Sequence, residues 1–300
     1  MHEALLYKKL SDLPAGKAGN RVRCQVCNHR CLILNGKRGI CGVRENRKGK
    51  LYSLVYGKII AEHIDPIEKK PLYHFMPGSF SLSIATIGCN FKCLHCQNAD
   101  ISQISKEKPE DVKILGEEVK PQKIIQDALE NKCPSISYTY TEPTIFLEFA
   151  LDCMKLAKEE GLRNVWVSNG YMTKETLDLI TPYLDAVNID LKAFSEEFYQ
   201  QVCGAQLKPV LENLIEIKKR RIWLEIATLI IPGKNDSEKE LKQIAEFIKN
   251  ELGDDTPWHV SRFFPHHKMQ DVPPTPIEKI YAAVEIGKKA GLKYVYPGNV

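Results

Sequence analysis

Short runs of β-branched and aromatic residues alternate with amphipathic helical stretches from about residue 80 to the end of the chain. This alternation is typical of parallel strands joined by crossover helices, so the sequence predicts an α/β fold. The sheet could be open and doubly wound or rolled into a barrel, and periodicity alone does not choose between them. The expected strands are residues 81–87, 136–140, 164–168, 186–191, 222–230, 258–263 and 294–296.

Two of the helices between these strands have recognisable beginnings. Ser237 and Glu240 form the S-x-x-E pattern of a capping box ahead of an apolar helical face. Thr275 and Pro276 follow the same logic, with proline at the first helical position and Gly291 at the far end. We therefore expect a capped helix to begin at each place.

The first quarter of the chain has a different character. Residues 1–75 contain four cysteines, the small-residue stretch Pro14–Gly19 and a charged, proline-rich run at 65–71 that is typical of a connector. We predict two domains, a Cys-rich segment at residues 1–75 that forms a metal knuckle, and a core at residues 76–300.

The composition excludes several classes of protein. With 43% hydrophobic and 27% charged residues, the chain can build a sizeable core and is not a disordered protein. The chain has 42 Lys and Arg and 38 Asp and Glu, and the basic residues alternate with the acidic ones along the sequence. This distribution does not indicate a basic surface for binding nucleic acid. No apolar run reaches the ~18 residues of a membrane span, and the N-terminus carries charge where a signal peptide would be apolar. We expect a cytoplasmic protein without membrane or nucleic-acid partners.

The ten cysteines are the most informative residues for function, because in a reducing compartment they indicate metal or redox chemistry rather than disulfides. Cys89, Cys93 and Cys96 follow the first strand as C-x3-C-x2-C, at the carboxyl edge where α/β sites lie. Closed zinc sites and standard cubane clusters take four protein ligands. Three cysteines therefore predict a [4Fe–4S] cluster with one open iron, and the alternative is a zinc site with His95 as fourth ligand.

This motif and four longer strings resemble the radical S-adenosylmethionine (SAM) superfamily. The strings are DPIEKKPLYHFMPG (65–78), GCNFKCLHCQNADISQ (88–103), YTYTEPTIF (138–146) and NIDLKAF (188–194). They resemble the branch called AmmeMemoRadiSam system radical SAM enzymes, itself described as similar to pyruvate formate-lyase activating enzyme. Members of that branch continue past a similar Gly-Asn-Val into a tail with further C-x2-C pairs, which this sequence does not contain.

The resemblance implies a fold and a reaction. The expected fold is a partial (β/α)6 barrel, open on one side, which makes residues 76–300 a radical SAM core. The open iron would bind SAM through its methionine amino and carboxylate groups, and one electron would cleave the S–C5′ bond. The 5′-deoxyadenosyl radical would then abstract hydrogen from an unknown substrate, which could be a protein. The superfamily also implies reduced flavodoxin or ferredoxin as electron donor.

The resemblance places SAM contacts at the ends of the second and third strands. Thr141 and Glu142 lie where many relatives have Gly-Gly-Glu-Pro, and a carboxylate suits the SAM ammonium. Glu142 could instead cap the following helix beside Thr144. Asn169 could bind SAM or simply make a turn with Gly170.

Further SAM contacts are implied on later strands. Asp190 and Lys192 belong to the Asp-Leu-Lys string of the activating enzymes, and alternation along a strand puts them on one face. They could also form a structural ion pair. His259 resembles the histidine near the adenosyl group, although it could be an ordinary histidine with satisfied hydrogen bonds.

A second set of cysteines lies in the N-terminal segment. Cys24, Cys27, Cys31 and Cys41 lie among residues typical of tight turns, as expected for a metal-stapled knuckle. Tetrahedral zinc is our first choice, a second iron–sulfur cluster is the alternative, and His29 could replace one cysteine. The three scattered cysteines, Cys133, Cys153 and Cys203, are expected to be small buried hydrophobic residues.

Other functions fit part of the sequence. A glycyl radical enzyme activating enzyme is the first alternative, whereas the branch name points to Memo-like and AMMECR1-like partner proteins. From different classes come an iron–sulfur electron carrier without SAM cleavage and a zinc-built binding module. Neither of these explains Glu142, Lys192 and a whole α/β core.

Overall fold

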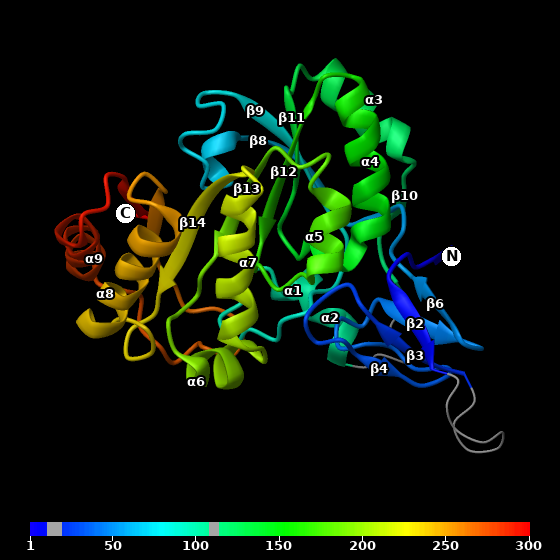
Figure 1. The fold of residues 1–300 in the computed structure, drawn as a ribbon, viewed down its shortest axis with the longest axis horizontal. Helices are drawn as coiled ribbons and strands as arrows, with labels where there is room; N and C mark the ends of the chain where they lie inside the picture. The colour runs from blue at the N-terminus through cyan, green and yellow to red at the C-terminus, as the bar shows by residue number, and fades with distance from the viewer. Residues whose placement is uncertain (11–19, 108–113) are drawn as a thin grey trace. The chain divides into compact units, whose positions relative to one another are not determined.

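The computed structural model describes residues 1–10, 20–107 and 114–300. The chain divides into two compact units, drawn from blue to red along the sequence in Figure 1. Unit 1 comprises Met1–Pro66, Ser79–Asn90 and Asn98–Asp185, and unit 2 comprises Ile67–Gly78, Phe91–Gln97 and Ala186–Val300. The predicted division into residues 1–75 and 76–300 stays a prediction, and Pro14–Gly19 lies outside the described residues.

The core of unit 1 is a sheet covered by helices. Its strands lie in the order β8 (Ala61–Pro66), β9 (Phe80–Ala85), β11 (Ser135–Tyr138) and β12 (Arg163–Ser168). Strands β9, β11 and β12 are parallel, whereas β8 runs antiparallel to β9 at the edge. All four residues of β11 are buried, as expected for a parallel strand covered on both faces. The helical elements are α1 (Ala99–Ser102), α2 (Ile104–Glu107), α3 (Pro121–Glu130), η2 (Pro143–Phe146), α4 (Leu147–Glu159) and α5 (Lys174–Ile180).

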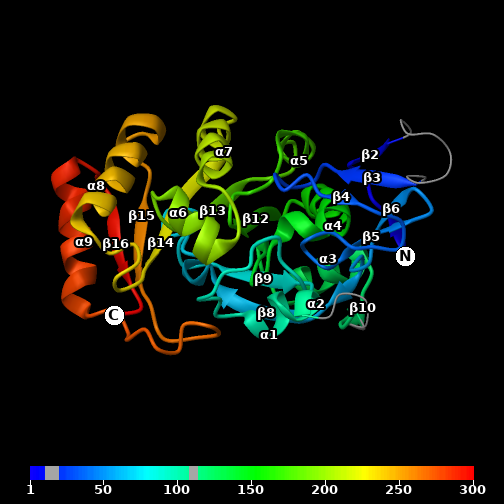
Figure 2. The ribbon, with the colours of Figure 1, turned by 90° about the horizontal axis from the view of Figure 1, so that it is seen from below.

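Short antiparallel strands make up the N-terminal part of unit 1. One three-stranded sheet has the order β1 (His2–Glu3), β6 (Lys50–Ser53) and β5 (Arg44–Arg47). The other has the order β2 (Tyr7–Leu10), β3 (Arg21–Cys24) and β4 (Leu32–Ile33), and both lie near the N-terminus in Figure 2. A small ladder joins β7 (Lys58–Ile59) to β10 (Glu117–Glu118).

Unit 2 continues the β/α alternation. Its parallel strands lie in the order β13 (Ala186–Asp190), β14 (Trp223–Ile230), β15 (Trp258–Arg262) and β16 (Val295–Gly298). The register places Asp190, Ala227, His259 and Tyr296 in one row, so these side chains share a face. The helical elements are η1 (Ile67–Lys69), α6 (Glu196–Phe198), η3 (Tyr199–Cys203), α7 (Leu207–Lys219), α8 (Glu238–Phe247), η4 (Ile248–Leu252) and α9 (Ile277–Ala290).

All seven expected strands are confirmed, and so is an α/β fold with a mainly parallel sheet. The predicted connector was partly wrong, because Asp65 and Pro66 end the edge strand β8. An edge position tolerates proline there, since one side of the strand needs no partner.

Of the two predicted helix caps, only one is confirmed. The Ser237 side chain accepts from the Glu240 N–H at the start of α8. Glu240 does not return the bond; its carboxylate accepts from the Phe194 N–H at 2.8 Å. The cap at Thr275 was wrong, because its hydroxyl bonds Phe263 and Ile230 instead of the first turn of α9.

A buried ion pair joins the N-terminal strands to the main helices of unit 1. Arg44 in β5 donates both terminal nitrogens to the Glu148 carboxylate in α4, at 3.0 and 2.6 Å. Both side chains are nearly inaccessible, 2% and 1% exposed. Glu148 also accepts from the Leu5 N–H, and the Arg44 Nε donates to the Ile145 carbonyl. A bidentate pair with these extra bonds satisfies the charges that burial has stripped of water.

We expect Arg44→Leu to lower the free energy of unfolding by about 3–5 kcal/mol, because Glu148 would remain buried without its partner. The double variant Arg44→Leu with Glu148→Leu should recover most of that loss. Urea denaturation measures both. Arg47→Leu is the control, since its pair with Glu45 is partly exposed and should contribute less than about 1 kcal/mol. A single-variant loss as small as that of the control would contradict the assignment.

The same pair predicts acid sensitivity. Burial alone would raise the pKa of Glu148, but the adjoining Arg44 guanidinium outweighs burial and holds that pKa below its usual range. A lowered folded-state pKa contributes stability above the ordinary carboxyl pKa of about 4.3, and this is lost as pH falls further. Between pH 5 and pH 3, wild type should lose more stability than the double variant. Parallel pH profiles would exclude this contribution.

Candidate functional site

The three cysteines of the C-x3-C-x2-C motif belong to different units. Cys89 follows β9 in unit 1, and Cys93 and Cys96 lie in the short stretch Phe91–Gln97 of unit 2. Cys89 and Cys93 are buried, and Cys96 is half-buried. We describe the surroundings of each set within its own unit.

Gly88 lets the chain turn into the first of these cysteines. Its φ is +96°, and a Cβ there would lie 2.8 Å from a Val43 methyl and 2.9 Å from the Cys41 carbonyl oxygen. Both the backbone conformation and the lack of space require glycine. The residue before Cys89 is therefore packed directly against the backbone of the N-terminal cysteine segment.

Main-chain hydrogen bonds hold the Cys93–Cys96 stretch on both sides. The N–H groups of Lys92 and Leu94 donate to the carbonyls of Cys203 and Val202 at the end of η3. The Lys268 N–H donates to the Leu94 carbonyl, and the His266 ring donates to that of Cys96 at 2.9 Å. His266 is exposed, but its ring bond to Cys96 anchors this stretch.

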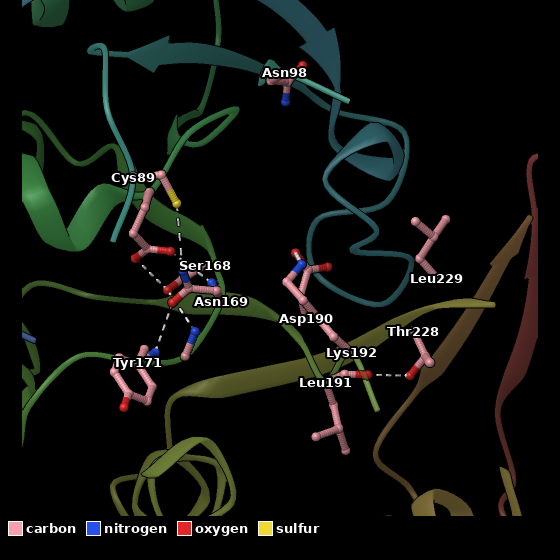
Figure 3. A network of polar contacts seen from close by, with 12 residues as sticks. Cys89, Asn98, Ser168, Asn169, Tyr171, Asp190, Leu191, Lys192, Thr228 and Leu229 are labelled. Carbon is pink, nitrogen blue, oxygen red and sulfur yellow. Dashed lines mark hydrogen bonds and ion pairs between the residues drawn. The ribbon is translucent and has the colours of Figure 1, made fainter. Parts of the chain in front are cut away.

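Asp190 and Lys192 form the ion pair that was one of the two expectations for them. Figure 3 shows the two side chains near each other. The Lys192 ammonium lies 3.0 Å from the Asp190 carboxylate, and the Lys192 and Asp190 side chains are 15% and 40% exposed. Burial disfavours the charge on Lys192, but Asp190 outweighs it and raises the pKa of the lysine well above its usual value. Lys192 thus remains a cation with its partner partly open to solvent.

Glu142 is completely buried and uses both of its carboxylate oxygens. It accepts from the N–H and hydroxyl of Thr144, which makes it the cap of η2. It also accepts from the Ser168 hydroxyl at 2.8 Å and the Asn169 N–H at 2.9 Å. Burial raises the pKa of this carboxyl group, and the four donors oppose that rise. The capping alternative for Glu142 is confirmed, and contact with SAM stays a prediction.

Asn169 links the Glu142 turn to the first cysteine. Its amide donates to the Asn90 side chain at 2.6 Å and points toward the Cys89 sulfur at 3.9 Å. Its Oδ1 accepts from the Tyr171 N–H, which closes the turn (Figure 3). Asn169 is therefore both a turn residue and a contact of the cysteine loop.

Tyr140 takes the left-handed conformation that glycine adopts easily. Its φ is +61°, and tertiary contacts hold it there. The Tyr140 hydroxyl donates to Asp65, and the Asn98 amide donates to the Tyr140 carbonyl at 2.7 Å. The next residue, Thr141, donates its hydroxyl to the Thr86 carbonyl at 2.9 Å. This turn contains no glycine that would adopt the left-handed conformation easily, and hydrogen bonds to neighbouring segments stabilise the conformation instead.

His259 is a satisfied buried histidine, as its alternative reading expected. It donates from Nε2 to Glu225 at 2.7 Å and stacks near Tyr296. Sequence reasoning missed Glu225, which is fully buried and also accepts from the N–H groups of Tyr73 and His74 and from the Trp223 indole. The signal was present, since Glu225 is the one acidic residue within an otherwise apolar strand run.

His95, the alternative zinc ligand, is buried in unit 2. Burial, together with nearby Lys192, lowers its pKa to about 3, so the imidazole is neutral. The scattered cysteines Cys133, Cys153 and Cys203 are buried, which confirms that expectation. In the described ranges no group of three or more His, Cys, Asp or Glu side chains is arranged to hold a metal ion.

The four N-terminal cysteines line one pocket of unit 1. Its other lining residues are Val26, Ile33, Gly39, Ile40, Arg44 and Ile145. Burial raises the pKa of Cys24 to about 12, and burial plus the neighbouring sulfurs raises that of Cys27 well above its usual value.

No helix among the described residues is long and apolar enough to cross a membrane.

Comparison with known proteins gives consistent matches. A family model described as the radical SAM superfamily matches residues 83–248. An uncharacterized protein of Methanocaldococcus jannaschii is 47% identical over 300 residues, 100% of this chain and 86% of that protein. Another protein of that organism, named as a candidate glycyl-radical enzyme activating enzyme, is 29% identical over 215 residues, 70% of this chain and 78% of that protein. The pyruvate formate-lyase 1-activating enzyme of Escherichia coli K12 is 24% identical over 165 residues, 54% of this chain and 66% of that protein.

Two solved structures resemble this one in fold. A radical SAM methyltransferase from Sphaerobacter thermophilus gives a TM-score of 0.54 at 13% identity, covering 75% of this chain and 68% of that chain. Streptococcus suis SuiB bound to the precursor peptide SuiA gives 0.56 at 14% identity, covering 73% of this chain and 49% of that chain. At such identities the likeness is one of fold.

The capping role of Glu142 can be tested by Glu142→Gln. The NH₂ group of the glutamine can only donate, but it would face N–H and O–H groups that also donate, so some of these groups would lose their acceptor. We therefore expect a loss of about 1–3 kcal/mol in the free energy of unfolding. Urea denaturation of the anaerobic protein measures it, with Glu159→Gln at the exposed end of α4 as control. Unchanged stability combined with weakened SAM binding would assign Glu142 to the ligand instead.

The left-handed backbone at Tyr140 predicts a reversal of the usual glycine effect. Tyr140→Gly should be more stable than Tyr140→Ala by about 1–2 kcal/mol, because only the Cβ is penalised at positive φ. The matched pair Lys155→Gly and Lys155→Ala, inside helix α4, should show the opposite order by about 1 kcal/mol. Equal ordering at both positions would mean that Tyr140 is not held in this conformation in solution.

Proposed function

Because this chain belongs to the radical SAM superfamily, we propose that it cleaves SAM with a [4Fe–4S] cluster held by Cys89, Cys93 and Cys96. The match to the superfamily spans all three cysteines. The resemblance to radical SAM and activating enzymes is confirmed, as is the expectation of an enzyme with radical chemistry. The single observation that carries the proposal is this cysteine motif directly after the first parallel strand, inside the matched region.

The donors in the chain fit the group that the family requires. When bound, the cluster and SAM together supply a 5′-deoxyadenosyl radical that abstracts hydrogen from the substrate. The chain supplies three soft thiol ligands, which suit iron–sulfur clusters. The amide of Asn169 is directed at the Cys89 sulfur, and η3 holds the stretch that carries Cys93.

The predicted SAM-binding residues form two groups, which differ in whether their polar atoms already bond other residues of the chain. Asp190 and Lys192 are proposed to bind SAM directly, since the Asp190 carboxylate is partly exposed beside a permanent cation. Thr141, Glu142, Asn169 and His259 have their polar atoms bonded within the chain. We assign these four residues to positioning the turns around the cofactor.

The relatives named as activating enzymes favour a polypeptide substrate. Their names support a protein whose backbone or side chain loses hydrogen, and a glycyl radical enzyme is the first candidate. We also propose reduced flavodoxin or ferredoxin as electron donor, and Memo-like and AMMECR1-like proteins as partners. The cytoplasmic location stays a prediction.

The proposed reaction is tested with protein purified without oxygen, reconstituted with iron and sulfide, and reduced in the presence of SAM. We expect wild type to form 5′-deoxyadenosine and Cys93→Ala to form none, because the cluster loses one of three ligands. Cys133→Ala is the matched control, a buried cysteine on the turn after α3, and should retain formation. Retained 5′-deoxyadenosine in Cys93→Ala would overturn the mechanism.

Iron without 5′-deoxyadenosine would call for adding Memo-like and AMMECR1-like proteins and candidate glycyl radical enzymes. Formation restored by one of these would identify the partner. If no addition restores it, the radical mechanism fails and the electron-carrier hypothesis replaces it.

A further inference from the structure

The residue after Cys89 carries a buried amide whose nitrogen has no acceptor in the chain. Asn90 is fully buried. Among the described residues, none forms a hydrogen bond with its side-chain nitrogen, Nδ2. Burying an NH₂ group without an acceptor is unfavourable, because the group loses its bonds to water and gains nothing in return. The free nitrogen therefore indicates an acceptor that the chain itself does not supply.

The neighbouring bonds determine which end of the Asn90 amide is the nitrogen. The Tyr171 N–H, which can only donate, bonds Asn169 Oδ1 at 3.0 Å. The NH₂ group of Asn169 then donates to Asn90 Oδ1 at 2.6 Å. Turning either amide over would place two donors face to face. Asn90 Nδ2 is thus the donor that remains free.

This amide lies beside the first cysteine of the C-x3-C-x2-C motif. The Cys89 sulfur is 3.8 Å from Asn90 Oδ1 and 3.9 Å from Asn169 Nδ2, and Figure 3 shows it directed toward Asn169. Nδ2 and Oδ1 belong to one planar amide group, so the free donor is also near this sulfur. A cysteine that binds iron loses its proton, and the sulfurs of a cluster accept hydrogen bonds. A cluster at Cys89 would therefore bring acceptors to this place.

The N-terminal segment anchors the backbone of Asn90. His29 donates from Nε2 to the Asn90 carbonyl at 2.9 Å, and its ring lies 4.9 Å from that of Tyr171. The Asn28 N–H donates to the Tyr171 carbonyl at 2.9 Å. These bonds hold the Asn90 loop and the Asn169 turn in place within unit 1. The direction of the free amide is therefore fixed before any cofactor binds.

We propose that the side-chain NH₂ group of Asn90 donates a hydrogen bond to a sulfur atom of the [4Fe–4S] cluster at Cys89 and raises the reduction potential of that cluster. The hydrogen bond requires the cluster of the proposed function, on which this inference rests. The reduced cluster carries one more electron, so a donor stabilises the reduced form more than the oxidised form. Asn90 thus makes it easier for the cluster to take up the electron that SAM cleavage requires.

The first test is a redox titration of the anaerobically reconstituted protein without SAM, followed by EPR of the reduced cluster. In Asn90→Ala, the ratio of reduced to oxidised cluster at a fixed potential should fall about tenfold, a shift of about 59 mV to more negative values. Asn164→Ala is the matched control, because Asn164 is also fully buried in unit 1 and its amide nitrogen donates to the Met154 and Tyr183 carbonyls. The control should keep the wild-type potential.

A second test detects the hydrogen bond itself. Protein is made with asparagine labelled with ¹⁵N in the side-chain amide, and the reduced cluster is studied by pulsed EPR. Wild type should show a nitrogen coupling that is missing in Asn90→Asp. This variant keeps the shape of the side chain and the oxygen that accepts from Asn169. It therefore also serves if Asn90→Ala fails to fold.

Two results would contradict the hydrogen bond while leaving the proposed function intact. In the first, the cluster assembles, but Asn90→Ala has the same potential as Asn164→Ala and Asn90→Asp loses no nitrogen coupling. In the second, the potential is unchanged and SAM binding is weakened, which would assign the NH₂ group to SAM. If wild type binds no [4Fe–4S] cluster, the proposed function fails together with the role of Asn90.

Discussion

The buried pair of Arg44 and Glu148 is the constraint on which unit 1 depends. One partner comes from a short antiparallel strand with little core of its own, and the other from a helix on the main sheet. Arg44 also bonds the carbonyl of Ile145, which lies in the turn capped by Glu142. One guanidinium therefore connects the N-terminal strands, the cysteine pocket and the turn beside the candidate site.

Buried carboxylates organise both units in the same way. Glu142 in unit 1 and Glu225 in unit 2 are each fully buried and each collect four donors from separate segments. A buried carboxylate is tolerated only when nearly all its acceptor sites are used. Each glutamate thus specifies where several loops must stand, with an accuracy that apolar packing alone would not give.

The strands and the cysteine motif could be predicted because they depend on local pattern. The seven strands follow from apolar runs, and the chemistry from the spacing of Cys89, Cys93 and Cys96. The edge strand β8 was missed because its charged, proline-containing residues do not show the pattern of a buried strand. The hydrogen bond between Asp65 and Tyr140 joins positions far apart in the sequence, so the local sequence pattern does not predict it.

The site residues show the same division. That Glu142 could cap a helix was visible from the nearby Thr144, whereas its bonds to Ser168 and Asn169 depend on how β11 and β12 align. His259 could be singled out but not assigned, because its partner Glu225 lies on another strand. Polar pairs between residues far apart in the chain cannot be predicted from a single sequence.

The packing of Gly88 against Cys41 has a consequence for how this chain can be divided. A cysteine-rich segment of this size is readily imagined as a detachable module appended to a catalytic core. Gly88, however, lies against the Cys41 backbone, and the His29 ring bonds the Asn90 carbonyl, so the two cysteine loops are in direct contact. Removing the N-terminal segment would uncover the start of the very loop that defines the core. The two have to be inherited, exchanged and engineered as one piece.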